Sequence, residues 1–185
     1  MSDVSLRLLE LSDLEQIMTW INDPEIVGNF GWFGKPVSRE EEQQYLERLI
    51  ASSTDKVYSA FSGGEYIGQV GLHELDDRNK QGRLSIIIGN KDNWGRGYAH
   101  QMVDALLDKA FNDLHVHKVW GVFLEQNKKA YRLFIEKCGF RIEGILRQEY
   151  YRGGVYHDMI RIAMLEDEYW ARAWEQADGG DQSVS

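Results

Sequence analysis

A glycine-containing turn between an apolar run and an amphipathic segment is the feature that most constrains the fold. Ile86-Ile87-Ile88 is β-branched throughout and predicts a buried strand. From Ala99 to Leu114, apolar residues recur at steps of three and four, which predicts a helix with one buried face. Gly95 and Gly97 therefore fall between the end of a strand and the start of a helix. This arrangement predicts an α/β fold.

The same turn has the chemistry of a phosphate-binding cradle. Glycine allows the backbone to approach a ligand closely, and a helix N-terminus offers unpaired N–H groups with a partial positive charge. Arg96 adds a cation there. No Gly-Lys-Ser/Thr follows, and the third glycine of the dinucleotide fingerprint is missing, so neither of those motifs applies. A tight turn that simply leads into a helix remains the alternative.

A second motif follows this turn, and the two together resemble a known family. It consists of Asn127-Lys128-Lys129-Ala130 and then Lys137-Cys138-Gly139-Phe140. With Trp94-Gly95-Arg96-Gly97-Tyr98-Ala99, it resembles the GNAT superfamily of acetyl-CoA-dependent N-acetyltransferases. In that family Gln/Arg-x-x-Gly-x-Gly/Ala cradles the coenzyme A pyrophosphate, and Trp94 stands where Gln or Arg is usual. The likeness runs from Leu6 to Trp170 and looks closest to the branch of ribosomal-protein N-terminal and spermidine acetyltransferases.

The resemblance implies an α/β GNAT fold with a mixed, mostly antiparallel central sheet of seven strands and helices on both faces. Seven runs are typical of strands: residues 5–9, 56–61, 66–75, 82–88, 118–124, 140–151 and 155–165. Capping boxes at Ser12 and Ser38 predict the first two helices, and Asn127 is expected to start a short one. A terminal helix is expected over residues 166–176.

Composition limits the class of protein and of partner. The 185 residues suit one domain, expected over 1–176, with a disordered tail over 177–185. No apolar run approaches the ~20 residues of a membrane span. The lone Cys138 excludes an internal disulfide and favours the cytoplasm. A net charge of −9 argues against a nucleic-acid partner and suits a cationic small molecule.

The resemblance also implies which residues bind acetyl-CoA. The main chain of the strand before the cradle is expected to contact the pantetheine and the carbonyl of acetyl-CoA. The two motifs are expected to bind the remainder of the coenzyme. The expected set is Ser85, Ile86, Ile87, Trp94, Gly95, Arg96, Gly97, Tyr98, Ala99, Asn127, Ala130 and Phe134.

The catalytic residues are less clearly indicated. Acetyl transfer needs a deprotonated amine, a polarised carbonyl and a thiolate that is protonated or tolerated. The family's acid is a Tyr seven residues after the Asn, but that position is Phe134, and counting back from Gly139 gives Ile135 because the helix has one extra residue. Tyr131 is the substitute we predict, with a packing role as the alternative. Glu74 is predicted to serve the amine, with a solvated surface group as the alternative.

The acceptor wall is expected to contain aromatic and hairpin residues. Besides Glu74, the candidates are Phe30, Trp32, Phe33, Tyr150, Tyr151 and His157. No histidine has a spacing that indicates a metal site, so no metal is expected.

The acidic composition favours a small cationic amine such as a polyamine as the acceptor. A protein N-terminus and an amino sugar or aminoglycoside remain alternatives. A non-catalytic coenzyme A-binding module is the rival class, supported by the missing Tyr. A homodimer is an expectation from resemblance alone.

Overall fold

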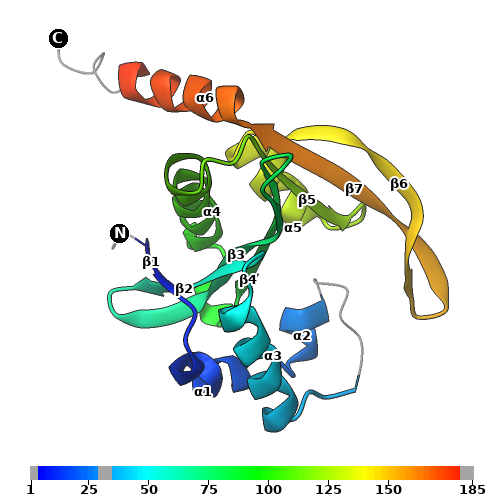
Figure 1. The fold of residues 1–185 in the computed structure, drawn as a ribbon. Helices are drawn as coiled ribbons and strands as arrows, with labels where there is room; N and C mark the ends of the chain where they lie inside the picture. Colours follow the sequence, from blue (N-terminus) through cyan, green and yellow to red (C-terminus); the bar gives the residue numbers. More distant parts are fainter. Residues whose placement is uncertain (1–3, 29–34, 180–185) are drawn as a thin grey trace.

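The computed structural model describes residues 4–28 and 35–179. Their strands form one seven-stranded sheet (Figure 1). Its order is β1-β2-β3-β4-β5-β7-β6, and every neighbouring pair is antiparallel except β4–β5. The strands are β1 (Val4–Leu8), β2 (Lys56–Ser62), β3 (Glu65–Asp76), β4 (Gln81–Ile88), β5 (Lys118–Leu124), β6 (Arg141–Arg152) and β7 (Val155–Leu165). The predicted mixed, mostly antiparallel sheet is confirmed.

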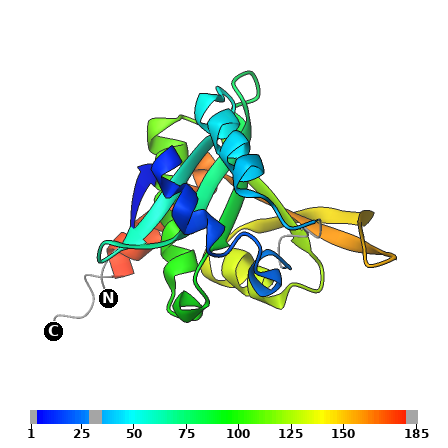
Figure 2. The same ribbon diagram turned by 90° about the horizontal axis from the view of Figure 1, so that it is seen from below.

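Helices cover both faces of the sheet, as predicted. One face carries η1 (Leu11–Asp13), α1 (Leu14–Met18), α2 (Pro24–Val27) and α3 (Arg39–Ala51). The other carries α4 (Tyr98–Asp108), η4 (Lys109–Asp113), α5 (Lys128–Tyr131) and η5 (Arg132–Lys137). Figure 2, seen from below, has α1–α3 in front of the sheet, and the β6–β7 hairpin extends away from the rest of the molecule. A short turn, η3 (Lys91–Asn93), precedes the cradle, and α6 (Glu166–Gly179) follows β7.

The alternation of side chains along β4 divides the interior into two cores. Ile86 and Ile88 pack against the core that contains α4, whereas Ile87 packs against the core that contains α1 and α3. Successive strand residues point to opposite faces, so a strand covered on both faces reads as a continuous apolar run. This explains why three consecutive isoleucines are favourable in β4.

The parallel pair β4–β5 is short, and this opens the sheet. Only Gln81–Arg83 of β4 pair with Lys118–Trp120 of β5. Beyond Arg83, β4 continues to pair with β3 on its other side, up to Ile88. The two parallel strands therefore diverge toward their C-terminal ends, where the cradle follows β4.

Helix capping agrees with the sequence at Ser38 and differs at Ser12. The Ser38 Oγ accepts a hydrogen bond from Glu41 N (3.2 Å), and Glu41 Oε2 accepts one from Ser38 N (2.8 Å), as the capping box predicts. The predicted box at Ser12 is wrong. Asp13 instead accepts from Glu10 N (3.0 Å), and the Ser12 hydroxyl donates to Glu10, because a 3₁₀ turn precedes α1.

Two segments predicted as ordinary helices end in π-helical turns. The α-helix of α4 stops at Asp108 and continues as η4, and α5 continues as η5. A π turn contains one residue more than an α turn would in the same span. The extra residue between Asn127 and Gly139 is therefore accommodated in η5.

The last helix runs further than residues 166–176, because α6 extends to Gly179. Among the described residues, none of the helices combines the length and apolarity that crossing a membrane requires.

Candidate active site

The divergence of β4 from β5 creates a large cavity, which we call the donor cleft. Its volume is about 800 Å³, and its lining comes from β4, the cradle, β5, the α5–η5 helix and the β6–β7 hairpin, with Ile26 from α2. The residues that line it include Arg83, Ser85, Ile86, Asn93, Trp94, Gly95, Gly97, Tyr98, Ala99, Phe123, Asn127, Ala130, Phe134 and Tyr150. A cavity of this size suits an elongated cofactor-sized ligand.

The cradle lies at one end of this cleft with the geometry of an anion site. Gly95 has φ +78° and Gly97 has φ +86°, a region that side chains other than glycine rarely adopt. A Cβ at either position meets nothing within 4 Å, so the space above the backbone is open to a ligand. Gly97 is the N-cap of α4, whose first N–H groups are available to phosphate.

An unpaired buried amide lies beside the cradle. Asn93 is 5 % exposed, and its Nδ2 has no hydrogen-bond partner among the described residues. Such a group costs free energy unless water or a ligand accepts its hydrogen bond. Because Asn93 also lines the donor cleft, its amide is suited to a ligand oxygen.

The donor cleft is positively charged, although the chain is acidic overall. Its ionisable lining includes Arg83, Lys129, Arg132 and Lys137, and no Asp or Glu lines it within the described part of the chain. Lys129 Nζ also lies 4.4 Å from the centre of the Trp94 ring. An anionic, phosphate-bearing ligand fits this lining and a cationic one does not.

Ten of the twelve predicted donor residues line this cleft, and two do not. Arg96 is exposed and outside it, and Ile87 points to the opposite face of β4. Asn127 lines the cleft and also caps α5, since its Oδ1 accepts from Ala130 N (3.0 Å).

A second, smaller cavity lies across β4, and we call it the acceptor cavity. Its volume is about 360 Å³. Its lining comes from the turn after α1, from α2, from α3 and the segment before it, and from β2, β3 and β4. It includes Trp20, Pro24, Val27, Lys35, Pro36, Glu42, Tyr45, Gln69, His73, Ser85, Ile86 and Ile87. Ser85 and Ile86 line both cavities. A short stretch of one strand therefore separates the two binding spaces.

Glu42 is the carboxylate of the acceptor cavity. It lies on α3, is 4 % exposed, and makes no ion pair within residues 4–28 and 35–179. Burial raises the pKa of its carboxyl group. An ammonium group bound beside it would compensate the charge, so the cavity suits a cation.

Three polar residues form a hydrogen-bonded chain, and two of them, His73 and Ser85, line the acceptor cavity. Asp55 Oδ1 lies 2.7 Å from His73 Nδ1, and His73 Nε2 lies 2.8 Å from Ser85 Oγ. Burial opposes ionisation of Asp55, but hydrogen bonds from Ser52 and His73 lower the pKa of its carboxyl group. The chain ends on the strand that the two cavities share.

The predicted catalytic residues lie outside both cavity linings. Glu74 has φ +53°, its side chain is 60 % exposed, and its carboxylate accepts from Arg83 Nε (2.8 Å). Tyr131 is 37 % exposed on α5 and does not line the donor cleft.

The predicted acceptor residues are only partly brought together. Tyr150 lines the donor cleft, whereas Tyr151 contacts Tyr156 and His157 contacts Gln126 on the surface. Phe30, Trp32 and Phe33 lie outside the described residues. The tip of the hairpin reaches α2, where Arg152 Nη1 donates to Gly28 O (2.9 Å).

Sequence reasoning did not identify Glu42, Asp55, His73 or Asn93 as parts of the site. Glu42 carried a usable signal, because it precedes Leu46 and Leu49 by four and seven residues on the apolar stripe of α3. A carboxylate on such a stripe is unusual, since Glu is rarely buried without a partner. His73 and Asp55 had no such signal in the sequence, because only tertiary structure brings them together.

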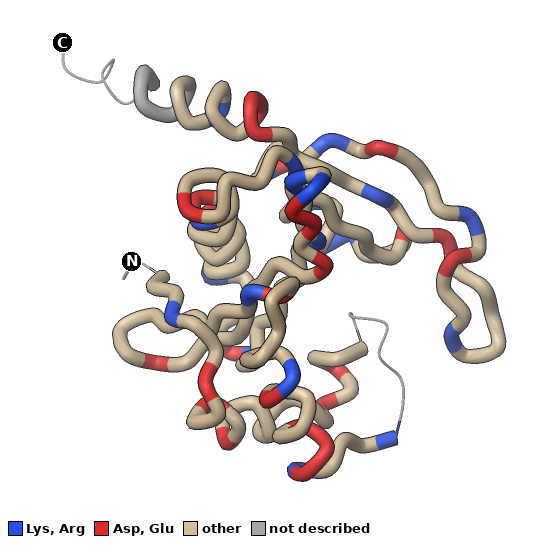
Figure 3. The backbone as a smooth tube through the Cα atoms, viewed as in Figure 1, with Lys and Arg blue, Asp and Glu red and all other residues tan. Residues whose placement is uncertain are grey.

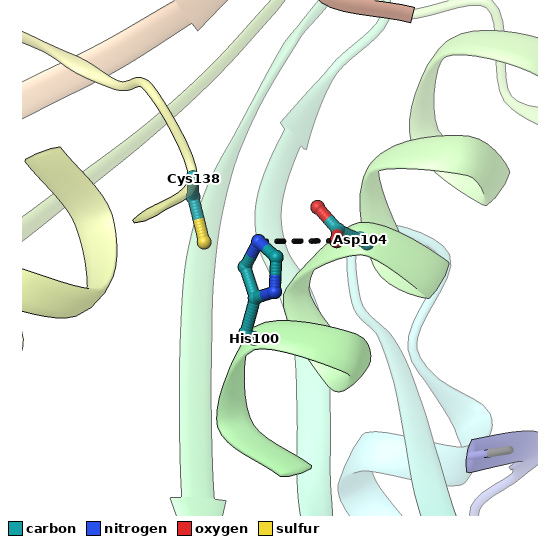
Figure 4. Close-up of side chains that lie close together, drawn as sticks. All are labelled: His100, Asp104 and Cys138. Carbon is teal, nitrogen blue, oxygen red and sulfur yellow. Dashed lines mark ion pairs between the residues drawn. The ribbon is translucent and has the colours of Figure 1, made fainter. Parts of the chain in front are cut away.

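His100, Asp104 and Cys138 lie close together, as Figure 4 shows. His100 also lines the donor cleft. Their potential ligand atoms lie within 4.8 Å of one another. However, Arg172 Nη2 already donates to Asp104 (2.7 Å), and burial raises the pKa of the Cys138 thiol to about 12. A protonated thiol and a carboxylate held by arginine are poor metal ligands.

Comparison with known proteins agrees with this geometry. The sequence matches the acetyltransferase (GNAT) domain family over residues 3–141, so the chain belongs to the GNAT acetyltransferases. It is an N-acetyltransferase that uses acetyl-CoA as the donor, and not the non-catalytic module of the rival hypothesis.

The similar proteins belong to the branch that the sequence predicted. The chain is 30% identical to spermidine N(1)-acetyltransferase of Vibrio cholerae, over 93% of this chain and 98% of that protein. It is 26% identical to the putative ribosomal N-acetyltransferase YdaF of Bacillus subtilis, over 90% and 93%. The crystal structure of the Vibrio cholerae spermidine N-acetyltransferase with CoA and spermine superposes with a TM-score of 0.84, at 28% identity, over 91% of this chain and 98% of that one.

Gly97→Ala is predicted to weaken coenzyme A binding by more than tenfold, or more than ~1.4 kcal/mol. The added methyl group enters the open space above the cradle, and the left-handed backbone becomes strained. Isothermal titration calorimetry measures the affinity. Gly64→Ala is the matched control, because Gly64 also has positive φ (+84°) and open space, but lies in the β2–β3 turn. Equal affinity in the two variants would contradict an anion site here.

Cys138→Ala is predicted to retain most of the parent's turnover. The thiol is fully buried, protonated and absent from the donor-cleft lining, so it cannot carry an acetyl group. Steady-state acetyl transfer, with thermal unfolding as the control for packing loss, provides the measurement. A fall of about a hundredfold in a folded variant would instead indicate a covalent acetyl-cysteine route.

Proposed function

We propose that the acceptor is a polyamine, and that the enzyme transfers acetyl from acetyl-CoA to one of its primary amines. The observation that carries this proposal is Glu42, a buried carboxylate in a largely apolar cavity across β4 from the donor cleft. A polyamine combines cationic nitrogens with apolar methylene segments. The carboxylate binds the former, and Trp20, Tyr45 and Pro36 suit the latter.

The surroundings of the acceptor cavity support a cationic ligand. Residues 10–51, which include α1–α3, carry nine Asp or Glu and three Lys or Arg. Figure 3 shows the acidic positions along these helices. Such a surface raises the local concentration of a cationic substrate and repels an anionic one. The similarity to spermidine acetyltransferases agrees with this choice.

On the donor side, each group has a role that follows from its position. Backbone N–H groups at the cradle bind phosphate oxygens, together with Lys129, Arg132 and Lys137, whereas the fourth lining cation, Arg83, is engaged by Glu74. The main chain of Ser85–Ile87, which β5 does not pair, donates to the acetyl carbonyl as charge develops there. Acetyl-CoA supplies the activated acyl group, and the lone buried thiol suggests that the reaction takes place in the reducing cytoplasm.

The group that protonates the leaving thiolate is the phenol of a tyrosine. Tyr131 is the candidate from sequence, and Tyr150 is the candidate from position, because it lines the donor cleft. Tyr131 and Tyr150 are alternative donors of the same proton, and substituting each in turn distinguishes them.

Tyr150→Phe is predicted to lower kcat by about ten- to a hundredfold, with the KM for acetyl-CoA nearly unchanged. Tyr131→Phe is the matched comparison, since it removes the same atom outside the cleft lining. Steady-state kinetics across the pH range measure both. If Tyr131→Phe alone lowers kcat, the acid belongs to α5, and Tyr150 only shapes the cleft.

Glu42→Gln is predicted to raise the KM for spermidine by about tenfold or more, because a hydrogen bond to a charged group contributes about 1.5–3 kcal/mol. In the parent, this KM is expected to fall as pH rises through the raised pKa of Glu42, because the carboxylate becomes charged while the amine stays protonated. The variant should lack that dependence.

The experiment compares spermidine and spermine with a peptide N-terminus and an aminoglycoside as acceptors. Glu47→Gln is the matched control, because Glu47 lies on the exposed side of the same helix, where it accepts from Gln43. A parent enzyme that prefers the peptide or the aminoglycoside would refute the polyamine proposal, as would equal effects of the two glutamate variants.

A further inference from the structure

We propose that Asp55, His73 and Ser85 form a proton relay that deprotonates the acceptor amine. This inference rests on the proposed function only in placing the amine in the acceptor cavity, and it holds for any primary amine bound there. His73 and Ser85 line that cavity, and Ser85 also lines the donor cleft. The relay therefore ends where the amine and the acetyl group meet.

The hydrogen bonds fix the direction in which a proton moves. Asp55 is ionised, so it accepts, and His73 Nδ1 carries the hydrogen that it donates over 2.7 Å. His73 Nε2 is then an acceptor, and it receives the Ser85 hydroxyl hydrogen over 2.8 Å. The remaining lone pairs of Ser85 Oγ are available to an ammonium N–H. An aspartate that orients a histidine, which in turn accepts from a serine, is a proven arrangement for moving protons.

The order of the strands explains why these three residues meet. His73 and Arg83 are paired across β3 and β4, and Gly71 is paired with Ser85. Residues two apart on a strand share a face, so His73 and Ser85 point to the same side as α3. Asp55 immediately precedes β2 on the other side of β3.

The charges around His73 are mixed. The groups that face the cavity or the chain from neighbouring elements are Asp55 before β2, Glu42 and Tyr45 on α3, Arg83 on β4 and Lys35 before α3. Asp55 contacts the imidazole directly, whereas Arg83 is engaged by Glu74. The imidazolium that forms is therefore stabilised by the nearest charge, while its side chain is only 12 % exposed.

The proton balance closes without another reactant. The ammonium gives one proton through Ser85 to His73 Nε2, which leaves a neutral amine. The amine nitrogen then forms a bond to the acetyl carbon, and the C–S bond breaks. A tyrosine phenol gives one proton to the departing sulfur, and the second proton of the nitrogen restores that phenol. His73 returns the first proton to solvent. The relay changes no oxidation state and forms no bond to the enzyme.

The relay is tested by measuring how kcat depends on pH for His73→Gln with the best acceptor of the panel. Because a positioned base contributes about 10²–10⁴-fold, kcat should fall by that factor, while the KM for acetyl-CoA stays nearly unchanged. In the parent, kcat should level off at the top of its acidic limb, whereas in the variant it should keep rising tenfold per pH unit, because hydroxide then removes the proton. Asp55→Asn should also lower kcat, since the carboxylate no longer fixes the tautomer and orientation of the His73 ring.

Matched variants separate this role from a structural one. His117→Gln removes an exposed imidazole that also faces a carboxylate, Glu166, and should match the parent. Ser85→Ala removes only a hydroxyl and should lower kcat, which keeps the test decisive if His73→Gln fails to fold. Glu74→Gln tests the base predicted from sequence, and its profile shows whether the acidic limb depends on that carboxylate.

Three outcomes would overturn the relay: a folded His73→Gln with the parent's pH profile, a Glu74→Gln that alone loses the acidic limb, or an acetylated Ser85 trapped by mass spectrometry. Failure of the polyamine proposal is distinguishable, because it appears as a different preferred amine in the parent enzyme and leaves the effect of His73→Gln intact.

Discussion

The early end of pairing between β4 and β5 is the constraint on which the rest of the site depends. After Arg83 and Trp120, the two strands separate, so the β5-facing peptide groups of residues 84–88 are outside any strand ladder. Backbone polar groups away from water need partners, so this unpaired edge favours a ligand with matching hydrogen-bonding groups. The sheet thereby loses ladder hydrogen bonds and gains a cleft lined by fixed dipoles.

The cleft between the separated strands also differs in charge from the chain as a whole. A chain with net charge −9 has a donor cleft whose ionisable lining residues are cations, while acidic residues gather on the helices of the opposite face. Net charge describes the interaction of the molecule with distant solutes, whereas binding depends on the groups within about a Debye length. An acidic protein is thus compatible with a polyanionic donor.

The donor half of the site was predictable from sequence because its parts are contiguous. Gly95, Gly97 and Ala99 occur in one turn, and Asn127 and Ala130 in the next short helix, so two short motifs carry the resemblance that implies their role. The acceptor half was not predictable in this way. Glu42, His73 and Ser85 come from α3, β3 and β4, and only the pairing of the strands and the packing of the helix bring them together.

The missing tyrosine shows a related limit. Counting residues from Asn127 or back from Gly139 gives different positions, because the π turn of η5 absorbs one residue between them. The fold itself was well predicted, since hydrophobic periodicity and turn glycines report strands and helices directly. The errors, such as the cap at Ser12, occurred where a short 3₁₀ turn replaced regular helix.

The shared wall of Ser85 and Ile86 has an evolutionary consequence. Most of the acceptor lining lies in the first third of the chain, whereas the cradle and α5 lie well after it. Substitutions in α3 can therefore remodel the acceptor cavity without changing the donor cleft, because no residue of that helix lines the cleft. Proteins with this arrangement can change their amine acceptor during evolution while they keep acetyl-CoA as the donor.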